Sequence, residues 1–188
     1  MRKRVLLFLT VIIGFCASYA SCADMPVPSI KDRWAANASF AYVMPEDAEY
    51  KESNNLLGSV GLSYGVTENV ATELEVGYFR LRSKNDTKTR VVSVLGNIEL
   101  RAKNFGKLTP YILGGIGVAF FEYGDLHPTE QKDKNFSHAW KAGAGLEYRF
   151  NDNWAGNFEA GHFYADTGGK THLDVYNWQL NLGLKYYF

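Results

Sequence analysis

Charged side chains recur at alternate positions in several stretches of this chain, as Glu147 and Arg149 do on either side of one residue. Carboxylates beside basic groups can perform acid–base chemistry, guide an ion, or form a buried network of ion pairs. Spacing by two places side chains on one face of a β-strand. The candidate residues on this face are Glu73, Glu75, Glu99, Arg101, Lys141, Glu147, Arg149, Glu159 and Lys185.

The elements that must position these charges are long strands. From Tyr176 to Phe188, large apolar residues alternate with mostly polar ones, and residues 139–150 repeat the pattern. Strands of soluble proteins usually run for about five or six residues. Strands of about ten residues or more, with charges on the second face, are typical of membrane barrels.

Similar segments occur along the rest of the chain, although both faces of residues 111–123 are apolar and leave their inward side undefined. The expected strands cover 34–44, 56–66, 70–81, 91–102, 111–123, 139–150, 154–166 and 176–188. The sequence therefore predicts an all-β fold, an eight-stranded antiparallel up-and-down transmembrane β-barrel.

The connections alternate in length, which is also typical of such barrels. Short polar links cover residues 67–69, 103–107 and 151–153, and longer ones cover 45–54, 83–88, 124–137 and 167–174. The turn at 151–153 would place Phe150 opposite Trp154 and, ten residues further up, Trp140 opposite Tyr164. Ten residues at a tilt of about 40° rise roughly 25 Å, the height of the apolar band between two aromatic girdles. We expect these four residues to form part of the girdles.

The first 23 residues have the features of a secretory signal peptide. Arg2, Lys3 and Arg4 precede an apolar run that is too short to span a bilayer, and Ser21-Cys22-Ala23 forms a cleavage site. Cleavage after Ala20, or a lipoprotein signal that uses Cys22, are the alternatives. Loss of residues 1–23 changes the 20 basic and 20 acidic side chains to 17 and 20, a net charge of −3. This mildly acidic chain is not suited to nucleic acid.

The pattern resembles the small outer-membrane β-barrel superfamily, which includes opacity-type surface antigens and the OmpA transmembrane domain. The glycine-rich strand at 111–119, the turns at 66–70 and 150–154, and the ending at 182–188 carry the resemblance. It implies a barrel domain of residues 24–188 in the outer membrane. It also implies that the barrel-assembly machinery recognises the terminal aromatic residues Tyr186 and Phe188.

The resemblance specifies the architecture more closely than the activity. An eight-stranded lumen is just wide enough for side chains to fill, so we expect the inward charges to form a plug. The leading hypothesis is a structural or surface-interaction protein whose partners are lipid and an extracellular ligand at loops 45–54, 124–137 and 167–174. The alternative is a narrow channel or transporter for ions or a small apolar molecule.

His162 raises the hypothesis of an enzymatic role. Lipid A deacylases of this architecture carry a histidine followed two places later by serine and asparagine, but Tyr164 and Ala165 occupy those positions here. We therefore expect no catalytic residues and, since no ligand spacing of the zinc type occurs, no metal or cofactor. A lipid A-modifying hydrolase is kept as a remote alternative.

Overall fold

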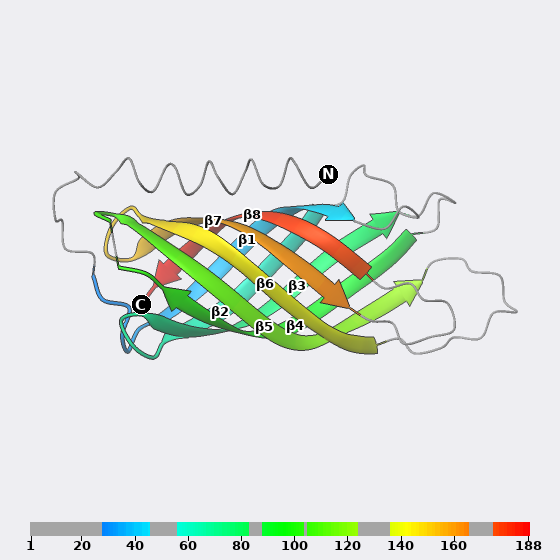
Figure 1. The fold of residues 1–188 in the computed structure, drawn as a ribbon, viewed down its shortest axis with the longest axis horizontal. Helices are drawn as coiled ribbons and strands as arrows, with labels where there is room; N and C mark the ends of the chain where they lie inside the picture. Colours follow the sequence, from blue (N-terminus) through cyan, green and yellow to red (C-terminus); the bar gives the residue numbers. More distant parts are fainter. Residues whose placement is uncertain (1–27, 46–55, 83–87, 104, 124–135, 166–174) are drawn as a thin grey trace, which may run out of the picture.

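The computed structural model describes residues 28–45, 56–82, 88–103, 105–123, 136–165 and 175–188. Eight strands make up most of this part of the chain (Figure 1). They are β1 (Trp34–Pro45), β2 (Leu56–Gly65), β3 (Val70–Arg82), β4 (Lys88–Arg101), β5 (Leu108–Tyr123), β6 (Phe136–Arg149), β7 (Trp154–Ala165) and β8 (Val175–Tyr187). The described ranges contain no helix long and apolar enough to cross a membrane.

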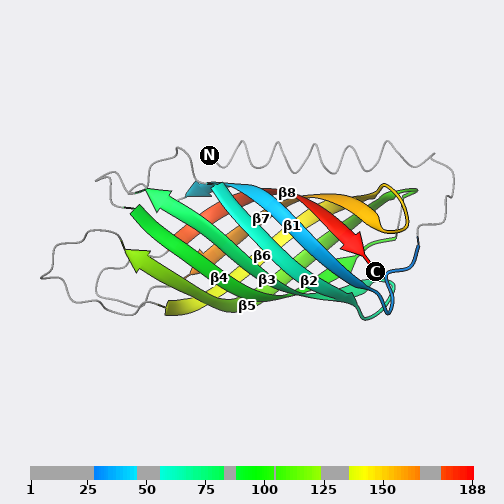
Figure 2. The same cartoon turned by 180° about the vertical axis from the view of Figure 1, so that it is seen from behind.

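The strands form one closed barrel in which each strand pairs with its neighbours in the sequence, and β1 also pairs with β8. Every pairing is antiparallel, and the strands cross the barrel obliquely in both side views (Figures 1 and 2). Closure leaves no edge strand with unpaired backbone groups. The predicted all-β fold of eight antiparallel strands is confirmed.

The register between β6 and β7 matches the prediction from the short turn. Trp140 lies opposite Tyr164, and the amide of Phe150 donates a hydrogen bond of 2.9 Å to the carbonyl of Trp154. Within the turn, Asn151 Oδ1 accepts hydrogen bonds from the amides of Asn153 and Trp154 at 2.9 and 2.8 Å. An asparagine side chain that satisfies two amides in this way stabilises a tight reversal of the chain.

Several strands are longer than the alternating pattern indicated. β4 begins at Lys88 instead of 91, β5 at Leu108 instead of 111, and β6 at Phe136 instead of 139. The expected loops at 83–88 and 124–137 were therefore too long, and Pro45 belongs to β1. Backbone pairing continues here because the ladder of hydrogen bonds does not require an apolar side chain at every second position.

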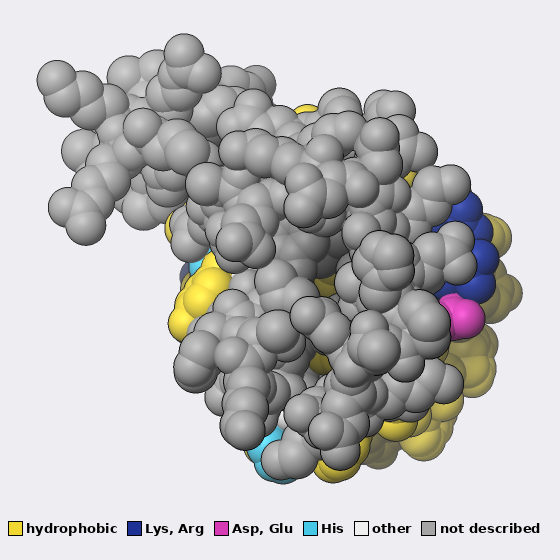
Figure 3. Space-filling view, turned by 90° about the vertical axis from the view of Figure 1, so that its right-hand side faces the viewer, with side chains coloured by type: hydrophobic (Ala, Val, Ile, Leu, Met, Phe, Trp, Pro, Cys, Tyr) yellow, Lys and Arg dark blue, Asp and Glu magenta, His cyan; other side chains and the backbone are white. Residues whose placement is uncertain are grey.

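The outer and inner faces of the wall differ as expected for a membrane barrel. Outward residues such as Phe40, Ile116 and Leu182 are 76%, 76% and 65% exposed, and hydrophobic side chains are visible along the right and lower edge of the barrel in the end view (Figure 3). In β5, whose inward side was undefined, Tyr111 and Phe121 point inward whereas Ile112 and Ile116 point outward. Such an apolar outer surface suits a hydrocarbon environment.

Leu146 lies on the outward parity of β6, midway between the two expected girdles. Replacing it with arginine should destabilise the folded barrel by about 2–4 kcal/mol, because a cation at the centre of the bilayer is poorly solvated. The measurement is the fraction of protein that migrates as a folded, heat-modifiable band on an unboiled gel. Leu146→Met is the matched control, and equal folded fractions for the two variants would contradict the assigned parity.

Candidate functional site: the barrel lumen

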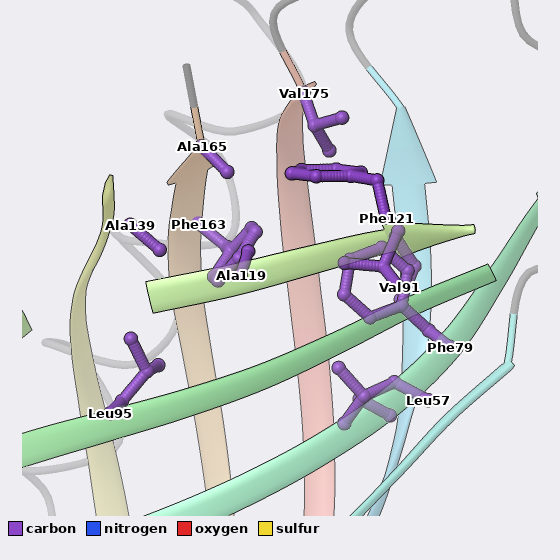
Figure 4. Packing of buried hydrophobic residues seen from close by; sticks show 12 residues of the cluster. Leu57, Phe79, Val91, Leu95, Ala119, Phe121, Ala139, Phe163, Ala165 and Val175 are labelled. Carbon is purple, nitrogen blue, oxygen red and sulfur yellow. The ribbon is translucent and has the colours of Figure 1, made fainter. Parts of the chain in front are cut away.

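The lumen is divided into an apolar half and a polar half. Towards the ends of the strands joined by the longer connections, inward side chains from all eight strands form one apolar cluster (Figure 4). Its members are Ala41, Val43, Leu57, Phe79, Val91, Leu95, Ala119, Phe121, Ala139, Phe163, Ala165 and Val175. Phe79 and Phe163 meet at its centre, edge to face, with 5.7 Å between ring centroids. This packing closes the half of the lumen that is nearest the longer connections.

The apolar cluster was not predicted from the sequence. It lies on the same parity as the charged residues, since Phe79 follows Glu73 and Glu75 at even spacing, and Phe163 follows Glu159. The sequence signal that could have predicted the cluster is the change from charged to apolar residues along the inward face of one strand. It shows that the lumen changes character with depth.

Next to the apolar cluster, on the side of the short turns, Lys141 forms ion pairs with two carboxylates from different strands. Its Nζ lies 3.0 Å from Glu75 Oε2 and 3.0 Å from Glu159 Oε1. Asn97 donates to Glu75 at 2.9 Å, and Asn181 donates to Glu159 at 3.1 Å. Lys141 and both carboxylates are about 6% exposed, so this ion triplet holds β3, β6 and β7 together across the lumen.

A second cluster occupies the end that carries the short turns. Arg101 binds both oxygens of Glu147, at 2.7 and 3.1 Å, and its Nη1 lies 2.6 Å from Glu99. Lys185 lies 3.2 Å from Glu99 and 3.4 Å from Glu147. The fork of the arginine matches the carboxylate, which is the stronger kind of ion pair. Three strands separated in the sequence, β4, β6 and β8, are thereby cross-linked.

Tyr187 and Arg149 complete this cluster. The Tyr187 hydroxyl donates to Glu147 at 2.8 Å. The Arg149 guanidinium lies 3.8 Å from the centre of the Tyr187 ring, and its Nη2 is 3.4 Å from Glu147. Stacking on the ring supplies Arg149 with a cation–π contact in place of a hydrogen bond.

Glu73 is placed differently from the other candidate residues. Glu75, Glu99, Glu147 and Glu159 are each within 3.0 Å of a cation and at most 6% exposed. Glu73 is partly exposed, and the described residues offer it no cation within ion-pair distance. Its polar neighbour is the amide side chain of Asn37, which lies beside it over Gly61. From the sequence alone, Glu73 is predicted to be equivalent to the other inward carboxylates, because it lies on the same face of its strand as Glu75.

The segment that precedes β1 closes the end of the lumen that carries the short turns. Ile30 is 5% exposed and packs with Ala35, Ala71, Ala155 and Tyr187. Hydrogen bonds anchor the segment: the Asp32 amide donates to the Gly65 carbonyl at 2.8 Å, and Arg33 Nη1 donates to the Asp152 carbonyl at 2.9 Å. This apolar cap was not predicted, because a single isoleucine outside a strand carries no periodic signal.

The aromatic candidates lie on the outer wall. Trp140 and Tyr164 are in contact near one end of the barrel, with ring centroids 5.7 Å apart. Phe150 and Trp154 lie at the other end, 49% and 45% exposed. Tyr186 packs against Trp154 and Phe188, with ring centroids 4.8 and 6.4 Å apart. Their roles as girdle and assembly signal stay predictions.

His162 also faces outward, packed among aromatic rings. Its centroid lies 5.2 Å from that of Trp178 and 5.5 Å from that of Trp140. The serines of the described strands (Ser39, Ser59, Ser63, Ser93 and Ser137) lie on the inward parity. A serine–histidine pair therefore does not form on this face of the described strands.

The remaining predictions fall on other parts of the chain. The signal peptide at 1–23 and almost all of the loops at 45–54, 124–137 and 167–174 lie outside the described residues. Within the described ranges, no group of three or more His, Cys, Asp or Glu side chains could hold a metal ion. Chemically, the described lumen is a plug of ion pairs between two apolar layers.

Comparison with known proteins identifies the kind of barrel. The family model for the outer membrane protein beta-barrel domain matches residues 7–188. Comparison with curated protein sequences gives no match.

Solved structures with the same fold differ in their described roles. Neisserial surface protein A is 13% identical, with a TM-score of 0.66 over 82% of this chain and 97% of that chain. Ail, the attachment invasion locus protein of Yersinia pestis, is 18% identical, with a TM-score of 0.53 over 84% and 99%. The outer membrane enzyme PagL is 16% identical, with a TM-score of 0.54 over 78% and 97%. At these identities the likeness concerns the fold alone.

Glu147, 1% exposed and contacted by three cations and a tyrosine, should contribute most to the stability of the plug. Glu147→Gln should destabilise the barrel by about 3–5 kcal/mol, since it leaves buried cations without their partner. The measurement is the urea midpoint of unfolding in lipid vesicles.

Glu122→Gln is the matched control for this change. Glu122 pairs with Arg90 at 3.1 Å, but both side chains are more than half exposed, so its loss should change the midpoint little. Equal shifts for the two variants would show that the buried cluster does not stabilise the barrel.

Proposed function

The chain belongs to the outer membrane protein beta-barrel domain family, and we propose that it is a closed outer-membrane barrel that acts through its surface. Its role is structural or consists of binding a partner outside the cell. The lumen does not serve as a diffusion pore.

The closed lumen is the observation that carries this proposal. The Phe79–Phe163 layer, the ion clusters around Lys141 and Arg101, and the cap at Ile30 follow one another along the barrel axis. Between them the described side chains leave a cavity of about 30 Å³. That volume holds roughly two or three water molecules, which is too little for a sugar to pass.

The strand order places the longer connections at one end of the barrel. In an up-and-down barrel, the links β1–β2, β3–β4, β5–β6 and β7–β8 share the end opposite the short turns. Outer-membrane barrels direct their longer loops outward. Residues 45–54, 124–137 and 167–174 are therefore the proposed contact segments for an extracellular ligand, and the names of Neisserial surface protein A and Ail are consistent with such a role.

A second candidate function rests on the apolar outer half of the lumen. Its side chains, among them Leu57, Val91 and Phe121, offer no hydrogen bonds and suit a small apolar molecule. Transport would require the cluster to open, because its rings are in contact at its centre. We rank this function below a surface role.

We propose no enzymatic activity for the chain. The fold itself does not decide the question, since PagL is an enzyme with a similar barrel. The argument rests on His162, whose outward face lacks a serine in the described strands. Mass spectrometry of lipid A from cells with and without the protein tests this proposal, and a lost acyl chain would contradict it.

The closed lumen predicts that wild-type protein reconstituted into liposomes admits no small sugar. Swelling in an isosmotic sugar solution should stay at the rate of protein-free liposomes, with a general porin as the positive control. Rapid swelling would show an open lumen, and the proposal would have to be replaced by a porin-like function.

A surface role predicts that the loops matter and the lumen does not. In a deletion strain complemented with a chain shortened within residues 125–134, cell-surface binding should fall, whereas solute permeability should match that of the wild-type complement. Heat modifiability of the shortened protein controls for folding. A permeability defect with normal surface binding would favour transport instead.

A further inference from the structure

The described strands direct one more carboxylate than cation into the lumen. Five carboxylates face inward from β3, β4, β6 and β7, whereas four cations face inward from β4, β6 and β8. The carboxylates are Glu73, Glu75, Glu99, Glu147 and Glu159, and the cations are Arg101, Lys141, Arg149 and Lys185. A further cation, Arg33, precedes β1 and lies at the end with the short turns, where its guanidinium is 5.5 Å from the centre of the Tyr187 ring and donates to the Asp152 carbonyl. Because an unpaired charge between apolar layers is costly, the strand carboxylate that has no cation beside it is a candidate to bind one.

The strand carboxylate that has no cation beside it is Glu73. The other four carboxylates lie within 3.0 Å of a basic side chain. Glu73 has the neutral Asn37 as its partner, and the two meet over Gly61: a Cβ at that position would lie 2.5 Å from Asn37 Oδ1 and 3.0 Å from Glu73 Oε1. The glycine therefore leaves the space in which this pair sits.

The cavity beside Glu73 is rich in acceptors. Asn97 and Asn181, 5% and 3% exposed, both line it, and the Oδ1 of each has no hydrogen-bond partner in the described part of the chain. Their Nδ2 groups are already used on Glu75 and Glu159. Buried oxygens without donors indicate a species that brings positive charge or protons. The cavity, about 30 Å³, has room for a small ion or a few waters.

We propose that this cavity is a binding site for one monovalent cation, held at the carboxylate of Glu73. The sources are a proton on the carboxyl group and a sodium ion coordinated by carboxylate and amide oxygens. The titratable groups that line the same cavity are Glu75, Glu99, Tyr111, Lys141, Glu159 and Lys185. The two lysines are bound to other carboxylates at 3.0 and 3.2 Å, so they act on Glu73 from beyond ion-pair distance.

The test compares wild-type protein, purified from membranes in detergent, with Glu73→Gln. Infrared spectroscopy at neutral pH detects a protonated carboxyl group, and thermal unfolding is compared in sodium chloride and in choline chloride at equal ionic strength. A protonated-carboxyl band that disappears in Glu73→Gln supports the site with a proton. A midpoint that is higher in sodium, with the difference lost in Glu73→Gln, supports it with sodium.

Two further variants make the result decisive. Glu122→Gln, whose carboxylate lies outside the lumen, should keep the band or the sodium effect of the wild type. If Glu73→Gln does not assemble, Asn37→Ala serves, because loss of the polar neighbour of Glu73 should shift the band or weaken the sodium effect. The proposal would be overturned if the wild type showed neither signal. It would also be overturned if a signal persisted unchanged in Glu73→Gln, or in Asn37→Ala where that variant takes its place.

Discussion

In hydrocarbon, backbone amides and carbonyls find hydrogen-bond partners only in one another. A sheet meets this requirement when its first and last strands pair, and here β1 and β8 do so from Ala35–Tyr187 to Pro45–Asn177. Closure with eight strands then sets the width of the interior. The outward alternation of apolar residues, the tight turns at one end and the filled lumen all follow from this one condition.

Because the interior is narrow, every inward side chain must pack against side chains from other strands. Long side chains from opposite walls meet, so charged ones must be paired, as Arg101 is with Glu147 and Glu99. Apolar ones can instead pack together, as Phe79 does with Phe163. The barrel uses ion pairs in one half and apolar packing in the other, and both close the lumen. The closed lumen is the reason for proposing that the protein acts through its outer surface and loops.

The same fold carries different roles among related structures, including a surface protein, an attachment protein and an enzyme. A shared fold therefore does not fix the role, which depends on the side chains that each chain places on it. In this chain the described lumen is filled, and Glu73 is the inward carboxylate that has no cation within ion-pair distance in the described residues.

The sequence by itself determined the strand number, the parity of most strands and the Trp140–Tyr164 register, because alternation and turn residues are local properties. It also singled out the inward charges, although it could not pair them. The partners of Arg101, the capping role of Ile30 and the inward side of β5 depended on which strands lie across the lumen, and only the closed tertiary structure decides that. Glu73 shares its parity with Glu75, yet one lies beside a lysine and the other beside an asparagine. That difference arises from the geometry across the lumen, which no local pattern records.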